Sequence, residues 1–463
     1  MGNYKSLAGD DATGVVARFI GLKGYFRVKD RIGIGLIGLG TVGSGVADIL
    51  RRNGDLIKRR LGVPVEIVKI VRRDTNKSLP AGLSPEVITT DIREVIENPD
   101  VDIVVEVIGG FEPAKGYILQ AIENGKHVVT ANKALLAVSG EELYHAASRR
   151  GVDLYFEGSV CGGIPIIKAI REGLSANRIE SIYGIVNGTS NFIMTKMTRE
   201  GKGFEEALRE TQALGYAEAD PALDIEGIDA AHKLAILVNI AFGTPVDFKA
   251  IYTEGISGIS PVDIRYATEL NYRVKLLAIA KMRAGCIEAR VHPTMVPNSH
   301  LIATVEGIFN AVYITGDAVG PTLFYGRGAG DLPTGSAVVG DILDVARNIL
   351  TGNSGRVPPA AFREEGRVPL RIMDIDEIES MYYFRFTVQD KPSVLSRISG
   401  ILGDHQISIA SVIQKERSDG GNVPLVMMTH EAVERNVKSA LEEINRLQAV
   451  SEKTTMIRVE EGK

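Results

Sequence analysis

Residues 32–43 read IGIGLIGLGTVG, an apolar segment that runs straight into a glycine-rich turn. In this spacing the first glycine allows a tight turn, the second leaves room for a phosphate, and the third lets the next helix pack closely. A strand precedes the turn and a helical stretch follows it, so a dinucleotide site is favoured over a turn without a ligand. The predicted cofactor contacts here are Gly38, Leu39, Gly40, Thr41, Val42 and Gly43.

Strand-like and helical segments alternate over residues 31–157, as in a doubly wound parallel sheet of the Rossmann type. Ligands of such sheets bind at the carboxyl ends of the strands, where Arg72, Gly109 and Lys133 fall beside the glycine turn. The predicted strands are Ile32–Ile37, Val65–Val71, Val101–Val107, Val128–Ala131 and Leu154–Phe156, and the predicted helices are Thr41–Arg52, Pro113–Asn124 and Gly140–Arg149.

The second predicted strand ends in Arg72-Arg73-Asp74. Two guanidinium groups at this position suit the 2′-phosphate of NADP(H), whereas Asp74 keeps NAD(H) possible through the ribose hydroxyls. Either arginine could instead extend into solvent. The sequence therefore favours NADP(H) and leaves NAD(H) open.

Residues 158–325 predict an α+β catalytic and dimerisation domain with a long amphipathic helix, Ile225–Phe242. A glycine-rich stretch and a small-residue helix, residues 326–350, are expected to pack back onto the first domain. Residues 351–380 resemble a linker. Residues 381–463 show the order βαββαβ of a ferredoxin-like domain. Residues 1–30 form an N-terminal extension without an assigned role.

Acidic residues gather in the stretch 215–233, which ends in Asp229 and Lys233. These two lie four residues apart on a predicted helix and therefore share a face. They could form an ordinary surface ion pair, but the helix continues as apolar residues, and a charged pair at the start of a buried helix costs desolvation energy. A cationic substrate amine would explain the acids, and a proton donor would explain the lysine.

Composition limits the class of protein further. The chain of 463 residues is 44% hydrophobic, has a net charge of −5 and contains two cysteines. No long basic segment, long apolar segment or secretion signal stands out, which argues against nucleic acid and membranes as partners and favours a cytoplasmic location.

Six motifs, in this order along the chain, resemble the homoserine dehydrogenase family: GLGTVG at 38–43, TANK at 130–133, EGSVCGGIP at 157–165, GIVNGTSN at 184–191, the 215–233 stretch and GRGAGD at 326–331. The tail resembles an ACT domain through DKPSVL at 390–395, where Ser393 stands in place of the usual glycine.

The resemblance implies NAD(P)H-dependent, reversible reduction of L-aspartate 4-semialdehyde to L-homoserine, a step toward threonine, methionine and isoleucine. It implies that Lys233 is the proton donor and that Lys133 lies near nicotinamide and substrate. It also implies a homodimer or homotetramer, and threonine as a regulator bound to the tail. The remaining implied residues are Thr189, Glu218, Asp224 and Asp229 for substrate, Gly109 and Gly328 for cofactor, and Glu157, Val160, Gly162 and Ile164 for a sodium ion.

Two other functions stay open at this point. One is an NADP-dependent oxidoreductase acting on another substrate, which would not need the acids of residues 218–229. The other is a regulator without catalytic activity that senses a nucleotide and an amino acid. For the tail, the alternative to regulation is dimerisation alone.

Overall fold

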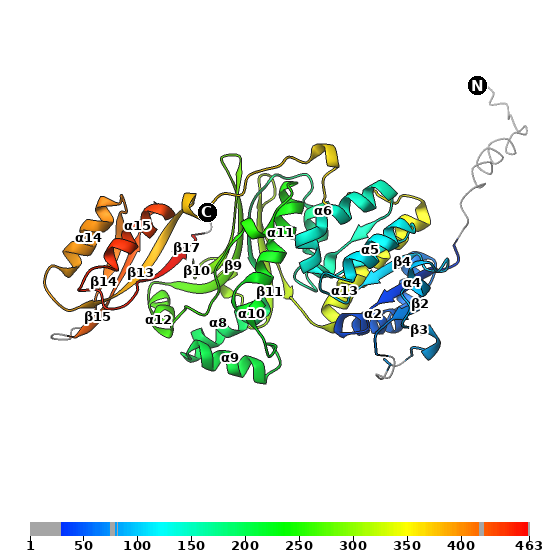
Figure 1. Ribbon diagram of the computed structural model, residues 1–463, viewed down its shortest axis with the longest axis horizontal. Coiled ribbons are helices and arrows are strands. Elements are labelled where there is room, and N and C mark those ends of the chain that lie inside the picture. Colours follow the sequence, from blue (N-terminus) through cyan, green and yellow to red (C-terminus); the bar gives the residue numbers. More distant parts are fainter. Residues whose placement is uncertain (1–28, 75–78, 81, 416–420, 462–463) are drawn as a thin grey trace, which may run out of the picture.

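The computed structural model describes residues 29–74, 79–80, 82–415 and 421–461, so the predicted extension at residues 1–30 lies almost wholly outside the described residues. Three parts follow one another along the long axis of the molecule (Figure 1). An N-terminal α/β part lies at one end, a mixed α+β part in the middle, and the C-terminal part at the other end. No helix of the described ranges is long and apolar enough to cross a membrane.

The N-terminal part is built on a six-stranded sheet in the order β3-β2-β1-β4-β5-β6, with every neighbouring pair parallel. The predicted doubly wound sheet is thus confirmed. The predicted strands are present with small shifts at their ends, and the short β3 is an addition. The bounds are β1 Ile32–Ile37, β2 Val65–Val71, β3 Ile88–Thr89, β4 Ile103–Glu106, β5 His127–Thr130 and β6 Leu154–Tyr155.

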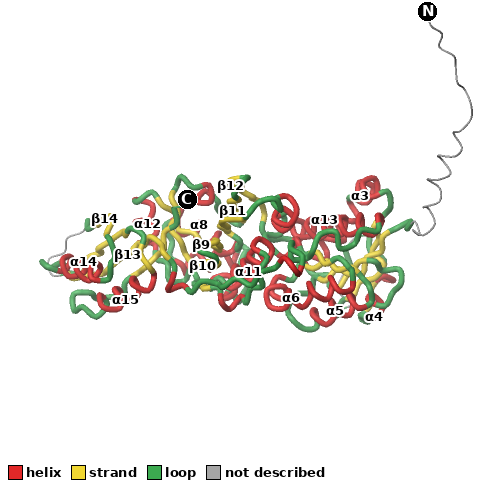
Figure 2. The backbone as a smooth tube through the Cα atoms, turned by 90° about the horizontal axis from the view of Figure 1, so that it is seen from above, coloured by secondary structure: helices red, strands yellow, loops and turns green. Residues whose placement is uncertain are grey.

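Helices cover both faces of this sheet (Figure 2). One face carries α4 (Arg93–Ile96), α5 (Ala114–Glu123) and α6 (Lys133–Arg150), and the other carries α2 (Thr41–Arg52), α3 (Gly54–Leu61) and α13 (Asp331–Thr351). Helix α13 returns from the middle part, and its Val338, Ile342 and Val345 are buried in the core under β1. The expected return of this helix to the first domain is therefore observed.

The middle part contains one end of a nine-strand path, β12-β11-β7-β9-β10-β17-β13-β15-β14. The long hairpin β9–β10 lies in the middle of this path and packs against α11. The sequence did not predict β9 and β12. The strands are β7 Ile179–Ile185, β8 Tyr252–Thr253, β9 Tyr272–Arg283, β10 Cys286–Pro297, β11 Phe309–Gly316 and β12 Gly320–Arg327; the helices are α7 Ile166–Lys168, α8 Gly188–Glu200, α9 Phe204–Ala213, α10 Ala222–Ile225, α11 Ile228–Phe242 and α12 Pro261–Glu269.

The helix expected over Ile225–Phe242 differs in two respects from the prediction. It begins at Ile228, after the separate short helix α10, because Gly227 adopts φ +81° between the two. It is also not amphipathic, since every residue from Asp229 to Ala241 is buried. Helix α11 is therefore a core helix, and the charged residues in its first turns lie inside the protein.

The C-terminal part has the predicted βαββαβ order, with one additional short strand, β16. Its sheet is continuous with that of the middle part, because β17 pairs in parallel with β10 at Thr294–Arg458 and Met295–Val459. Glu460 then accepts hydrogen bonds from Arg290 and Lys281 at this junction. The bounds are β13 Glu379–Gln389, α14 Val394–Asp404, β14 Ile409–Ile413, β15 Asn422–Thr429, β16 Ala432–Val433, α15 Glu434–Ile444 and β17 Thr455–Val459.

Candidate active site

The glycine turn after β1 has the geometry that a pyrophosphate requires. Gly38 adopts φ +106°, which favours glycine. A Cβ at Gly43 would lie 2.2 Å from the Gly38 carbonyl oxygen, so only glycine allows α2 to pack this closely. A Cβ at Gly40, by contrast, would point into open space in front of the helix N-terminus. The three positions fit a dinucleotide held on the first N–H groups of α2.

A cavity of about 490 Å³ opens in front of this turn. Gly38, Leu39 and Gly40 line it on one side, and the ends of β2 and β4 line the other. It therefore combines most of the predicted cofactor residues: Gly38, Leu39, Gly40, Arg72, Arg73 and Gly109. Thr41 and Val42 begin α2 behind the turn, and Gly328 lies elsewhere, against the side chain of Asn310.

Two lysines from different parts of the fold share one carboxylate. Lys133, the first residue of α6, pairs with Oδ1 of Asp229 at 2.6 Å, and Lys233 donates to Oδ2 at 2.7 Å. The Lys233 ammonium also donates to the carbonyl oxygen of Val186, just after β7, at 2.6 Å. Helices α6 and α11, which carry these residues, lie side by side where the first two parts meet (Figure 1).

Burial and charge act in opposite directions on this cluster. Asp229 and Lys233 are 4% and 8% exposed. Burial favours the neutral carboxyl, but the two ammonium groups outweigh it and hold the pKa of Asp229 well below its usual range. Burial lowers the pKa of Lys233, but the Asp229 charge outweighs it and raises the pKa above its ordinary value. Lys233 is therefore charged at neutral pH, and Lys133 remains partly exposed beside it.

Asn187 completes the cluster, and sequence reasoning gave it no role. Its amide donates to Asp229 at 2.8 Å and to Asp224 at 2.7 Å, while its side-chain oxygen caps α8. The quoted motif at 184–191 contains Asn187, so its place after a strand and before a helix was the available signal. Next along the chain, Thr189 donates its hydroxyl to the carbonyl oxygen of Tyr216.

Glu218 lies apart from this cluster, on the exposed loop between α9 and α10. Its carbonyl oxygen accepts a hydrogen bond from Gln212, but no described contact joins its carboxylate to either lysine. The structure thus brings together four of the predicted residues, namely Lys133, Asp224, Asp229 and Lys233.

The Glu157 carboxylate points toward the backbone of α7, which the sequence did not indicate. It accepts hydrogen bonds from the backbone N–H groups of Ile167 and Lys168 at the start of α7. Burial raises the pKa of Glu157 to about 7 despite these bonds. The Glu157 carboxylate is therefore engaged by backbone N–H groups beside the turn of residues 157–164. Gly162 packs against Gly328 there, since a Cβ on Gly162 would lie 2.6 Å from the Gly328 oxygen.

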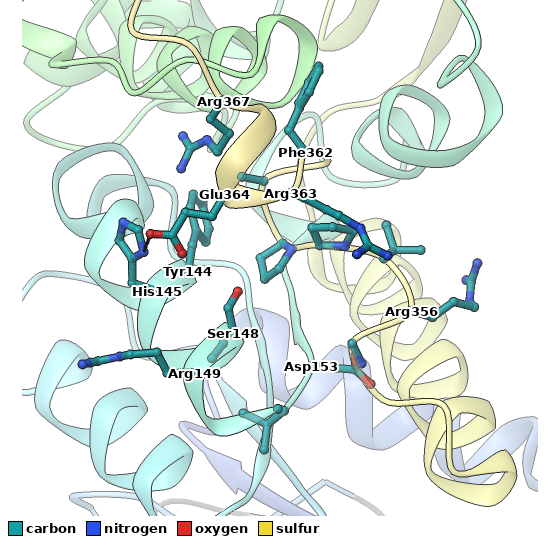
Figure 3. Close-up of a pocket in the computed structure, with 18 of the residues that line it drawn as sticks. Tyr144, His145, Ser148, Arg149, Asp153, Arg356, Phe362, Arg363, Glu364 and Arg367 are labelled. Atoms are coloured by element: carbon teal, nitrogen blue, oxygen red, sulfur yellow. Dashed lines mark hydrogen bonds and ion pairs between the residues drawn. The ribbon is translucent and has the colours of Figure 1, made fainter.

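A second cavity, of about 440 Å³, lies between the C-terminal half of α6 and residues 355–367 (Figure 3). Arg149, Arg356 and Arg363 line this cavity. On its wall, Nδ1 of His145 lies 3.1 Å from Oε1 of Glu364. Neither Lys133 nor the α11 cluster lines this cavity, so it is separate from the charged site described above.

Known proteins share both the sequence and the fold of this chain. Three family models match: "Homoserine dehydrogenase, NAD binding domain" at residues 38–157, "Homoserine dehydrogenase" at 165–343 and "ACT domain" at 382–449. A homoserine dehydrogenase of Pseudomonas aeruginosa is 49% identical over 92% of this chain and 98% of its own length. The chain belongs to the homoserine dehydrogenase family. The predicted oxidoreductase class and the C-terminal ACT domain are therefore confirmed.

Solved structures of homoserine dehydrogenases agree with this assignment. The enzyme of Thiobacillus denitrificans is 50% identical and superposes with a TM-score of 0.88 over 93% of this chain and 98% of that one. A hyperthermophilic archaeal homoserine dehydrogenase in complex with NADPH is 29% identical, with a TM-score of 0.58 over 68% of this chain and 97% of its own. The NAD-binding model and this geometry support a nicotinamide cofactor for the present family member.

Proposed function

We propose that this homoserine dehydrogenase interconverts L-aspartate 4-semialdehyde and L-homoserine, with Lys233 as the proton donor and acceptor. The observation that carries the assignment is the buried Lys233 ammonium, fixed by Asp229 and the Val186 carbonyl beside the partly exposed Lys133. When bound, the nicotinamide cofactor supplies or accepts the hydride at the substrate carbon. The chain supplies position, charge and the proton.

Lys233 gives its proton to the oxygen of the aldehyde as that oxygen gains negative charge, and takes it back in the oxidation direction. General acid catalysis of this kind is worth about 10²–10⁴-fold in rate. Asp229 keeps Lys233 protonated and directed, because its carboxylate raises the pKa of the buried amine. Asn187 in turn holds Asp229 and Asp224 at a fixed separation.

The remaining residues bind the polar ends of the substrate. Asp224 offers a carboxylate to the α-ammonium group, and Glu218, on the exposed loop before α10, offers a second one. Thr189 offers its hydroxyl from the start of α8. The exposed part of Lys133 serves the substrate carboxylate or the reacting oxygen. These assignments follow from charge complementarity with an amino-acid substrate.

We propose NADP(H) as the preferred cofactor because Arg72 and Arg73 both line the cavity at the end of β2. The archaeal relative was solved with NADPH. Replacing both arginines by serine is expected to raise the KM for NADP⁺ by about 10–100-fold and to leave the KM for NAD⁺ nearly unchanged. Initial rates of homoserine oxidation with each cofactor measure this.

Arg59 on the exposed side of α3 provides the matched control, because it does not line the cavity. Its replacement by serine should leave both KM values unchanged. Equal losses with NADP⁺ and NAD⁺ in the double variant would contradict recognition of the 2′-phosphate by these arginines.

A monovalent cation such as sodium is proposed at the turn of residues 157–164. The backbone oxygens of Glu157, Val160, Gly162 and Ile164 are its ligands, because carbonyl oxygens suit a hard cation. Cys161 and Gly162 adopt φ +56° and +48°, which curls this turn so that successive carbonyls can converge. The ion would brace the turn against the Gly328 loop.

The ACT domain is proposed to bind threonine as a feedback inhibitor. A cavity of about 690 Å³ is lined by residues 388–395 together with Gln414, Lys415 and Leu425. Ser393 occupies the N-cap position of α14 with φ +72° and makes no side-chain capping hydrogen bond; glycine adopts this conformation without strain. Serine therefore costs stability at this position, of the order of 1 kcal/mol.

Threonine is expected to inhibit the full-length enzyme, and Ser393→Gly is expected to bind threonine at least as tightly while stabilising the domain. Initial rates against threonine concentration measure inhibition, and thermal denaturation measures stability. Ser396→Gly, further along α14, is the matched control and should be destabilised, since glycine costs about 1 kcal/mol inside a helix. Absence of threonine inhibition in the wild-type enzyme would leave dimerisation as the role of the tail.

We also propose a homodimer or homotetramer in the cytoplasm. The outer edge of β14 has no strand neighbour in the described sheet, and Val412 on this strand is 41% exposed. Tyr325 on the opposite edge strand, β12, is 54% exposed. Unpaired edges with apolar side chains are suited to pairing with a second copy. Both cysteines are free thiols, as a reducing compartment would keep them.

A further inference from the structure

Glu106 is a fully buried carboxylate at the end of β4, and the mechanism above does not use it. It is 0% exposed. Its Oε1 accepts hydrogen bonds from the N–H groups of Ile108 and Gly109 at 2.9 and 3.1 Å, and its Oε2 accepts one from the Thr130 hydroxyl at 2.6 Å. The carboxylate therefore lies directly under the loop that follows β4.

The partners of Glu106 suit an ionised carboxylate, because each of them can donate a hydrogen bond to it. All three contacts are donors, and an ionised carboxylate is an acceptor only, whereas a protonated one would spend an oxygen on its own proton. The short contact to Thr130 falls in the range of hydrogen bonds to a charged oxygen. Within the described ranges, no lysine, arginine or histidine forms an ion pair with Glu106.

This charge lies at the nicotinamide end of the proposed cofactor site. The pyrophosphate belongs at Gly38 and Gly40, and the adenosine end at Arg72, so the nicotinamide end extends along β4 and β5 in the opposite direction. Gly109, which Glu106 holds through its N–H, lines the same cavity as Gly38 and Arg72, and the contact of Glu106 to Thr130 extends from there to the end of β5.

A ring of hydrogen bonds connects Glu106 to Asn132, the residue that precedes Lys133 of the catalytic cluster. The Thr130 hydroxyl accepts from the backbone N–H of Asn132, whose amide donates to the Gly110 carbonyl on the loop after β4. Asn132 also caps α6, the helix that begins at Lys133. The Glu106 carboxylate is thus fixed between the cofactor loop and Lys133, with no freedom to turn away.

The charges beyond this ring balance one another. Lys133 and Lys233 carry two positive charges, and Asp229 and Asp224, linked through Asn187, carry two negative ones. Glu106 takes part in none of these pairs, so the described contacts give its carboxylate no counter-charge. A buried charge acts through a low effective dielectric, so its field reaches several ångströms with little screening.

We propose that Glu106 tunes the cofactor's redox balance by binding the cationic, oxidised nicotinamide more tightly than the neutral, reduced form. The oxidised and reduced forms of the cofactor differ by one positive charge on the nicotinamide ring and have nearly the same shape. A fixed negative charge nearby therefore favours loss of hydride from the bound cofactor, which is the direction of aldehyde reduction. This role rests on the cofactor site proposed above. In it, Glu106 acts on the nicotinamide ring through its charge and does not take part in the chemical step.

The test compares the dissociation constants of NADP⁺ and NADPH. Fluorescence titration gives that of NADPH, and competition against it gives that of NADP⁺. In Glu106→Gln the ratio Kd(NADP⁺)/Kd(NADPH) is expected to rise by about tenfold, because the charge is lost at nearly constant shape. Glu106→Asp, which keeps the charge, should return the ratio most of the way to that of the wild type.

Thr130→Val is the matched control. It removes the hydroxyl contact to Glu106 but leaves the carboxylate charged, so both dissociation constants should change by the same factor. A purely structural role for Glu106 predicts the same behaviour for Glu106→Gln. An unchanged ratio in Glu106→Gln would therefore overturn the proposal.

A second variant covers the case in which Glu106→Gln does not fold. Ile108 is 42% exposed and lines the cavity above Glu106. Ile108→Lys places an opposing charge there and should raise the same ratio, while Ile108→Gln should not. If the wild-type protein bound neither NADPH nor NADP⁺, the proposed function itself would fail; if it bound both and neither charge variant moved the ratio, only this inference would fail.

Discussion

Replacing Lys233 with alanine is expected to lower kcat by at least about 100-fold in both directions, with NADPH affinity nearly unchanged. Lys233 is the buried amine held by Asp229 and the Val186 carbonyl, away from the cofactor cavity at Gly38 and Arg72. Its loss removes the proton donor and leaves the cofactor cavity intact. Stopped-time or continuous absorbance assays at saturating substrate give kcat, and fluorescence titration gives NADPH affinity.

Two further variants separate proton transfer from charge and from general effects on folding. Lys233→Arg keeps a positive charge but cannot release its proton at neutral pH, so it should be nearly as inactive as the alanine variant. Lys275 is another buried lysine, on β9, which donates to the Val305 carbonyl. Lys275→Ala should keep kcat within a few-fold of the wild type. Near-normal turnover in Lys233→Ala would remove Lys233 from the proposed role.

Asp229→Asn is expected to change the pH dependence of the reaction as well as its rate. In the wild-type chain the Asp229 charge raises the pKa of Lys233 above its ordinary value, so the amine stays protonated through the neutral range. Without that charge, burial is opposed only by weaker influences such as the Asp224 charge, so the pKa of Lys233 falls. For aldehyde reduction, which needs the protonated amine, the alkaline fall of kcat should move to lower pH by about one unit or more.

The pH profile of kcat for reduction checks this, with Asp224→Asn as the control. Asp224 has no direct contact with Lys233 and its charge raises the pKa of Lys233 less than that of Asp229 does, so Asp224→Asn should raise the KM for substrate and move the alkaline limb much less than Asp229→Asn. An Asp229→Asn profile that merely drops in height, with its limb unmoved, would contradict the electrostatic role given to Asp229.

Local pattern was enough to predict the first sheet and the turn that follows β1. Short apolar strands and the spacing of Gly38, Gly40 and Gly43 depend on contacts within one βαβ unit, which the sequence displays directly. The separation of four residues between Asp229 and Lys233 likewise predicted that both lie on one face of a helix. What local pattern could not supply was Lys133 as the second partner of Asp229, since it comes from a different helix about a hundred residues earlier.

The amphipathic description of α11 was wrong, whereas the expectation that Asp229 and Lys233 begin a buried helix agrees with the structure. In the structure His232, Lys233 and Asn239 are all buried with partners of their own. Polar side chains on a fully buried helix are stable only when neighbouring groups form hydrogen bonds or ion pairs with them. Glu141, the partner of Asn239, lies about a hundred residues earlier in the chain, so periodicity alone could not indicate it.

Two other features depended on three-dimensional context. The Glu157 carboxylate accepts hydrogen bonds from the N–H groups of Ile167 and Lys168 in α7, about ten residues later, a contact that the sequence did not indicate. The parallel pairing of β17 with β10 joins the ACT domain to the catalytic sheet, although the two strands are far apart in the chain. Pairings of this separation leave no trace in a hydrophobic pattern.

The most direct test of the central claim is a crystal structure of the complex with NADP⁺ and L-homoserine. The account predicts that the homoserine hydroxyl lies about 2.6–3.2 Å from Nζ of Lys233 and faces the nicotinamide bound beyond the Gly38–Gly43 turn. A hydroxyl placed out of reach of Lys233, with another side chain within hydrogen-bond distance of it, would contradict the account.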